Sequence, residues 1–173
     1  MENNKNKSLL EDFESYLISE KLNYQFGSDK KLILLNISGI NGSYRFIARI
    51  SIKKNIFILF STCPIKVPKN RISTISEFIN RANYNVLTGK FEFNYDDGEI
   101  FYTTTLDFGK IELFDTSIFE NLFWINFNMM DKYLPAIMEI LYGNKTPKEA
   151  IADIDNNDKE KDKKKVNHDI CMN

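Results

Sequence analysis

The sequence has very few of the side chains on which most catalytic and metal sites depend. It contains one histidine, His168, and two cysteines, Cys63 and Cys171, among 173 residues. The cysteines form no CxxC pair, and a zinc site or a Ser-His or Cys-His nucleophile would need a histidine within the folded body. The sequence therefore predicts no catalytic, cofactor-binding or metal site, and its cysteine usage favours a reducing compartment.

The chain also lacks an excess of charge and a long apolar run. Its formal net charge is −1, whereas binding to nucleic-acid phosphates requires a surplus of Lys and Arg. The most apolar stretch, residues 122–141, is interrupted by Asn126, Asp131 and Pro135, so it does not resemble a membrane span of about 20 apolar residues. The polar N-terminus carries no signal peptide. We expect no nucleic-acid partner, no membrane span and a cytoplasmic location.

Aromatic residues, by contrast, are plentiful. The chain has 14 Phe and 8 Tyr, and 43% of its residues are hydrophobic, which is enough for the core of one domain. Residues 1–7 are polar, and residues 153–173 are rich in Asp, Asn and Lys with almost nothing apolar. We expect a single domain over residues 8–152, with a disordered N-terminus (1–7) and a disordered charged tail (153–173).

Hydrophobic periodicity predicts the elements of this domain. The first half reads as a helix from Ser8 to about Leu22, followed by three strands near 32–37, 44–52 and 56–60. The second half reads as a helix over 69–85, a hairpin closed by Asp97-Gly98, and a long apolar helix that Pro135 is expected to kink or break. The order α-β-β-β-α-β-β-α specifies an α+β fold, an antiparallel sheet of about five strands with helices packed on it.

Two polar clusters admit a structural and a functional interpretation. Asp96, Asp97 and Glu99 either form a metal-binding or acid/base cluster or mark a hairpin turn, and the turn is favoured because Asp-Gly is typical of such turns. The group Asn80, Arg81 and Asn83 either contacts a ligand or ties the end of the second helix to the hairpin. The structural role is favoured because Asn near a helix C-terminus commonly caps or turns the chain.

The long apolar helix admits both a structural interpretation, as part of the core, and a functional one, as a protein-interaction surface. Apolar side chains cover most of its circumference. This is typical of a helix buried against a sheet, but aromatic and Met side chains are also enriched at protein interfaces. If one face stays open, the candidate protein-interaction surface consists of Phe119, Phe123, Phe127 and Met130.

Several motifs together resemble the YbjN family of bacterial sensory-transduction regulators. The resemblance covers about Ser8 to Ala152 and implies a type III secretion chaperone-like fold with no known enzyme activity and no assigned catalytic residues. The motifs that carry it are Pro64-Ile65-Lys66-Val67-Pro68 with Arg71, Phe78-Ile79-Asn80-Arg81-Ala82-Asn83, Gly89-Lys90-Phe91-Glu92-Phe93, Asp96-Asp97-Gly98-Glu99-Ile100, Asp131-Lys132-Tyr133-Leu134-Pro135-Ala136-Ile137, and Gly143 with Pro147-Lys148-Glu149-Ala150.

These observations lead to one main functional hypothesis and two alternatives. The main hypothesis is a non-catalytic protein that binds another protein, or a second copy of itself, through the apolar helix or the sheet face, in a chaperone-like or regulatory role. One alternative is a small-molecule-binding or enzymatic domain with a pocket between helix and sheet. The other is a dedicated toxin-neutralising partner.

Overall fold

The computed structural model describes the backbone of residues 2–28, 30–51, 54–84, 86–109 and 117–171, and the side chains of these residues between 9 and 159. Helix α1 (Glu2–Ser19) is followed by β1 (Tyr24–Phe26), β2 (Leu32–Ser38), β3 (Ser43–Ser51) and β4 (Ile56–Thr62). A 3-10 turn (Lys69–Arg71) leads into α2 (Ile72–Asn83), and the chain continues through β5 (Lys90–Phe93), β6 (Ile100–Asp107), α3 (Ser117–Tyr142) and α4 (Pro147–Cys171).

The strands form one antiparallel sheet in the order β1-β2-β3-β4-β6-β5. The α+β class is confirmed, but the sheet has six strands where the sequence predicts about five. The additional strand is β1, which pairs with β2 over only three residues. Three residues are too few to show a period-2 pattern. The strand is also tied to α1, because the Tyr24 hydroxyl donates a hydrogen bond to Glu14.

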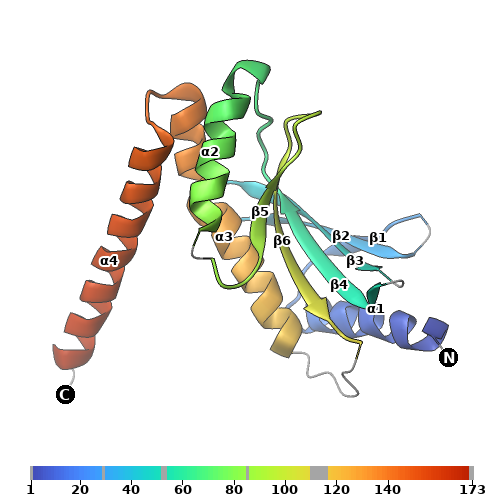
Figure 1. Cartoon of the computed structure of the whole chain (residues 1–173). Coiled ribbons are helices and arrows are strands. Elements are labelled where there is room, and N and C mark those ends of the chain that lie inside the picture. The colour runs from blue at the N-terminus through green and yellow to red at the C-terminus, as the bar shows by residue number, and fades with distance from the viewer. Residues whose placement is uncertain (1, 29, 52–53, 85, 110–116, 172–173) are drawn as a thin grey trace.

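The core lies on one side of the sheet. Along β2, β3 and β4, alternate side chains are fully buried while the residues between them are only half-buried or exposed. Helices α1, α2 and α3, with Ala150 and Ile154 of α4, supply the other half of the core. Among the described residues, Figure 1 shows no helix across the opposite side of the sheet. The inward-facing set includes Ile33, Leu35, Tyr44, Phe46, Ala48, Phe57, Leu59, Phe91 and Tyr102.

Helix α3 runs without a break through Pro135, where the sequence suggests a kink or a break. Proline has no N–H, so the carbonyl of Asp131, four residues earlier, loses its usual donor within the helix. The side chain of Asn41 replaces it, with Nδ2 donating to the Asp131 carbonyl oxygen at 2.9 Å. A turn between β2 and β3 therefore satisfies the acceptor that proline leaves free, which helps the helix to continue.

The Asp131 carboxylate of α3 also forms hydrogen bonds with the same turn. It accepts hydrogen bonds from the backbone N–H groups of Ile40 (3.2 Å) and Asn41 (2.9 Å). The Tyr44 hydroxyl donates to it at 2.7 Å. Burial and the hydrogen bond to Asp131 raise the pKa of Tyr44 well above its usual value, so the phenol stays protonated as a donor. We call these hydrogen bonds, together with the hydrogen bond from the Asn41 side chain to the Asp131 carbonyl, the Asn41–Asp131 clamp.

Glycine is needed in the turn because the chain approaches α3 so closely. A Cβ atom at Gly39 would lie 2.2 Å from Oδ1 of Asp131, and one at Gly42 would lie 2.6 Å from Cδ2 of Leu134. Real Cβ atoms do not approach other heavy atoms to such distances, so a larger residue at either position would force the Asp131 or Leu134 side chain to move.

Helices α1 and α4 extend toward the two ends of the chain. Helix α1 begins at Glu2 rather than near Ser8 and ends at Ser19, and α4 continues to Cys171 through most of the segment 153–173. Thr146 and Glu149 form a capping box at the start of α4: Glu149 Oε2 accepts from the Thr146 N–H at 2.9 Å. Ile154 is 7% exposed, so packing extends past Ala152. The Lys and Glu residues of α4 suit a helix, because both are good helix formers.

The clamp makes a specific prediction for a double-mutant cycle. Asn41→Ala should lower the free energy of unfolding by about 1–3 kcal/mol, because it leaves the Asp131 carbonyl without a donor. In a Pro135→Ala background the same substitution should cost about 1 kcal/mol less, since alanine at position 135 restores the N–H within the helix. Urea denaturation followed by circular dichroism measures all four proteins. Asn128→Ala, exposed on α3, is the control and should change both backgrounds by the same small amount, because alanine favours the helix more than asparagine does. An equal cost of Asn41→Ala in both backgrounds would show that the amide does not replace the missing donor.

Candidate protein-binding surface

The structure places the four candidate residues of α3 against the sheet and α1. Phe119, Phe123 and Met130 are each 0% exposed, and only Phe127 is half-buried. Phe123 packs on Phe46 of β3 with ring centroids 5.1 Å apart. The structure therefore matches the core interpretation for this face of α3, since a partner could reach these side chains only if the helix left the sheet.

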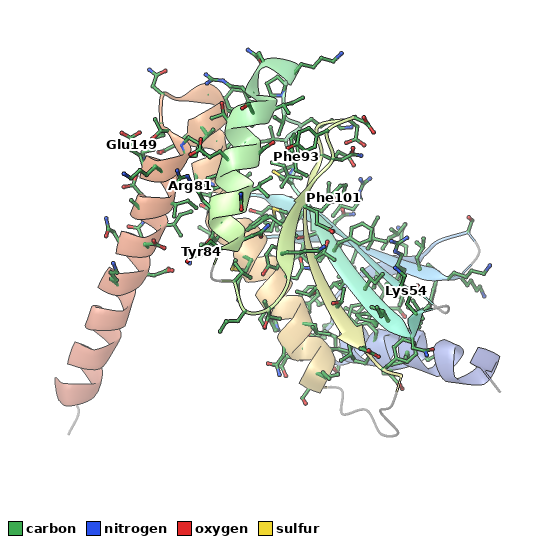
Figure 2. All side chains as sticks on the ribbon, in the orientation of Figure 1. Lys54, Arg81, Tyr84, Phe93, Phe101 and Glu149 are labelled. Atoms are coloured by element: carbon green, nitrogen blue, oxygen red, sulfur yellow. The ribbon has the colours of Figure 1, made fainter. Side chains whose placement is uncertain are left out.

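The opposite side of the sheet carries a second apolar surface. In the sheet register, Leu34, Ile47 and Phe60 lie side by side on β2, β3 and β4, and all three are half-buried. Phe101 of β6 contacts Phe60 with ring centroids 5.8 Å apart, and Figure 2 shows it on the side of β6 away from α2. We call this surface the open-face patch; it comprises Leu34, Ile47, Ile58, Phe60 and Phe101 together with Arg45 and Arg49.

The two arginines give the open-face patch its charge. Arg45 and Arg49 are exposed and flank Ile47 on β3. The Arg49 guanidinium lies 5.7 Å from the centroid of the Phe60 ring, within cation–π range.

The β5 edge of the sheet carries an ion pair, in which Lys90 Nζ lies 2.8 Å from Oε1 of Glu92. Burial acts to raise the pKa of Glu92, but hydrogen bonds from Lys90 and Thr103 outweigh it and hold this pKa below its usual value. The positive charges of Lys90 and Arg49 act in the same direction as these bonds. Glu92 is therefore a stable anion at the margin of the open-face patch.

Asn83 and Asp97, one residue from each polar cluster identified in the sequence, form structural hydrogen bonds. Asn83 binds the edge strand β5 on both of its backbone groups: Nδ2 donates to the Phe91 carbonyl at 2.9 Å, and Oδ1 accepts from the Phe91 N–H at 2.8 Å. The tie between helix and hairpin is confirmed. In the hairpin turn, Asp97 Oδ1 accepts from the Glu99 N–H at 2.9 Å, as the turn interpretation predicts.

A cavity of about 480 Å³ lies between the β2–β3 turn, α3 and α4. Its charged groups already pair with each other: Lys132 with Asp158, and Lys145 with Glu139 and Asp153. Hydrogen bonds with Asp153 and Glu139 raise the pKa of Lys145 above its usual value. The cavity is therefore lined by an ion-pair network that holds α4 against α3.

The most consequential polar residues of α3 are not apparent from the sequence pattern. Asn126 is 0% exposed, and its Nδ2 donates to the carbonyls of Leu59 (3.0 Å) and Tyr102 (2.9 Å), which anchors α3 across β4 and β6. Asp131 is 8% exposed. One signal could have identified Asp131: it lies four residues before a proline within a helix, where a carbonyl needs an external donor.

Membrane-spanning and metal-binding features are absent from the part of the chain that the structure describes. Within it, no helix is long and apolar enough to cross a membrane. The same residues contain no group of three or more His, Cys, Asp or Glu side chains placed to hold a metal ion. Cys63 is buried, and burial raises the pKa of its thiol to about 11. The side chains of His168 and Cys171 lie outside the described set.

Comparison of the chain with known protein families identifies its family. A family model described as "Putative bacterial sensory transduction regulator" matches residues 10–137. The chain belongs to the YbjN family. The resemblance carried by the sequence motifs is thus confirmed, although the family match ends before α4.

A YbjN protein of known structure has the same fold. The crystal structure of YbjN from E. coli, described as a putative transcription regulator, shares 14% sequence identity with this chain at a TM-score of 0.51. The match covers 78% of this chain and 90% of that one. At this identity the likeness shows the fold alone. No curated protein matches the chain.

Burial predicts losses of stability of different size for aromatic residues on the two sides of the sheet. Phe123→Ala should lower the free energy of unfolding by about 3–5 kcal/mol, because it empties a fully buried site. Phe101→Ala, on the open-face patch, should cost less than half as much, since its ring is already partly in water. Urea titration monitored by circular dichroism measures both. A small cost for Phe123→Ala would mean that α3 does not pack on the sheet as described.

Proposed function

We propose that this YbjN protein is non-catalytic and acts in a regulatory or chaperone-like role by binding another protein through the open-face patch. The observation that supports this is the position of the apolar side chains. Leu34 of β2, Ile47 of β3, Phe60 of β4 and Phe101 of β6 lie together on the face that α1, α2 and α3 do not cover. Apolar patches of this kind mark contact sites more often than isolated apolar residues do.

The composition of the patch also fits a protein partner. Protein interfaces are enriched in aromatic and Arg side chains and depleted in Lys and Glu at their centres. The patch has two Phe and two Arg around an aliphatic centre, and its lysine–glutamate pair lies at the β5 edge. A reducing cytoplasmic location, which the unpaired Cys63 fits, is part of the same proposal.

Small-molecule binding is the less favoured alternative. The cavity found lies between helices and a turn rather than between helix and sheet. The Asp131 carboxylate beside it is occupied by the turn, and the lysines are paired with acids. A ligand would therefore have to displace existing bonds before it could form its own.

Site-specific photo-crosslinking in the native host tests the proposal. A photoreactive phenylalanine analogue at Phe60 or Phe101 should give a discrete adduct heavier than the 20.3 kDa chain. The matched control is the same analogue at Tyr142, which is 67% exposed at the end of α3 and should give no such adduct. Mass spectrometry then identifies the attached protein. Failure of both patch positions to form an adduct, or equal adducts from Tyr142, would contradict the proposal.

A further inference from the structure

The charges of the open-face patch are arranged around its apolar centre. Arg45 and Arg49 are four residues apart on β3, so their Cα atoms are separated by about 13 Å along the strand. Ile47 lies midway between them, with Leu34 and Phe60 as its register partners on either side. A segment that lies across Ile47 therefore passes between two guanidinium groups.

Neither guanidinium group forms an ion pair with a described carboxylate. The ion pairs of the described residues near the sheet join Lys90 to Glu92 and Lys66 to Glu99, and none includes Arg45 or Arg49. The positive charge of Arg49 helps to lower the pKa of Glu92. The Glu92 carboxylate, however, forms its ion pair with Lys90 and accepts a hydrogen bond from Thr103. Because both arginines are exposed, their guanidinium groups are hydrated in the free protein. A guanidinium group is weakly hydrated, so pairing it with a carboxylate of a partner costs little desolvation free energy. The planar guanidinium group can bind a carboxylate through two parallel hydrogen bonds.

From this arrangement we infer that the open-face patch binds an acidic, apolar peptide segment of a partner protein. Apolar side chains of that segment cover Ile47, Ile58 and Phe60, and carboxylates on its two flanks pair with Arg45 and Arg49. The inference rests on the proposed function and adds the chemistry of the partner to it. Charge complementarity of this kind contributes mainly to specificity and to the rate of association.

Two other occupants fit the observations less well. Nucleic acid would need several cations along a phosphate path, but here two arginines enclose an apolar centre and the net charge of the chain is −1. A second copy related by a two-fold axis through Ile47 would bring the cationic strands β3 together, with like charges opposed. Both occupants are outcomes of the experiment below.

The experiment measures binding of two fluorescent peptides to the full chain by anisotropy. The peptides share the same Leu and Phe residues and differ only in carrying Glu or Lys between them. The acidic peptide should bind at least about tenfold more tightly than the basic one, and added salt should reduce the difference. The double variant Arg45→Glu/Arg49→Glu should reverse this preference.

The control variant is Lys69→Glu/Lys148→Glu, which makes the same change in net charge at exposed positions away from the patch. It should alter the affinity for the acidic peptide by less than about threefold. Equal binding of the two peptides, or an equal loss in the control variant, would overturn the inference. Such a result would leave the proposed function standing if the photo-adducts at Phe60 and Phe101 still form. Preferential binding of a DNA or RNA oligonucleotide, or self-association that blocks both peptides, would also overturn it.

Discussion

The attachment of the β2–β3 turn to α3 through Asp131 is the interaction on which the arrangement of this protein depends. The Asp131 carboxylate accepts hydrogen bonds from backbone N–H groups of the turn. The Asp131 backbone carbonyl, which Pro135 leaves without a donor in the helix, accepts a hydrogen bond from the Asn41 side chain of the same turn. The bonds join positions about ninety residues apart in the sequence. They hold α3 at a fixed position on one side of the sheet, and Asn126 anchors the helix a second time across β4 and β6.

A helix fixed in this way determines which side of the sheet is left open. The aromatic residues of α1 and α3 pack with those of the inward-facing strand positions, so the core is complete on that side. The outward-facing positions of the same strands still carry apolar side chains, which a sheet with one solvated face would normally replace with polar ones. The apolar character of this face, which no described helix covers, is the physical basis for proposing a binding surface there.

Much of the fold is predictable from the sequence because its elements have strong periodicity. Alternation in β3 and the 3–4 spacing in α2 appear in the structure where the sequence places them. Three features were less accessible. Strand β1 is too short to show a period, the continuity of α3 depends on a donor from a distant turn, and the choice between core and interface for Phe123 depends on what lies opposite it. Each depends on a tertiary contact, which local pattern does not encode.

One face of the sheet is covered by helices and the other is open, so adjacent residues of β3 should differ in their access to solvent. In a Cys171→Ser background, Ile47→Cys should react rapidly with a thiol reagent under native conditions, because position 47 faces outward. Ala48→Cys, whose position is 0% exposed, should react as slowly as the buried Cys63. The thiol at position 47 should therefore react much faster than the thiol at position 48. Equal protection of positions 47 and 48 would contradict it, because the outer face would then be covered as well.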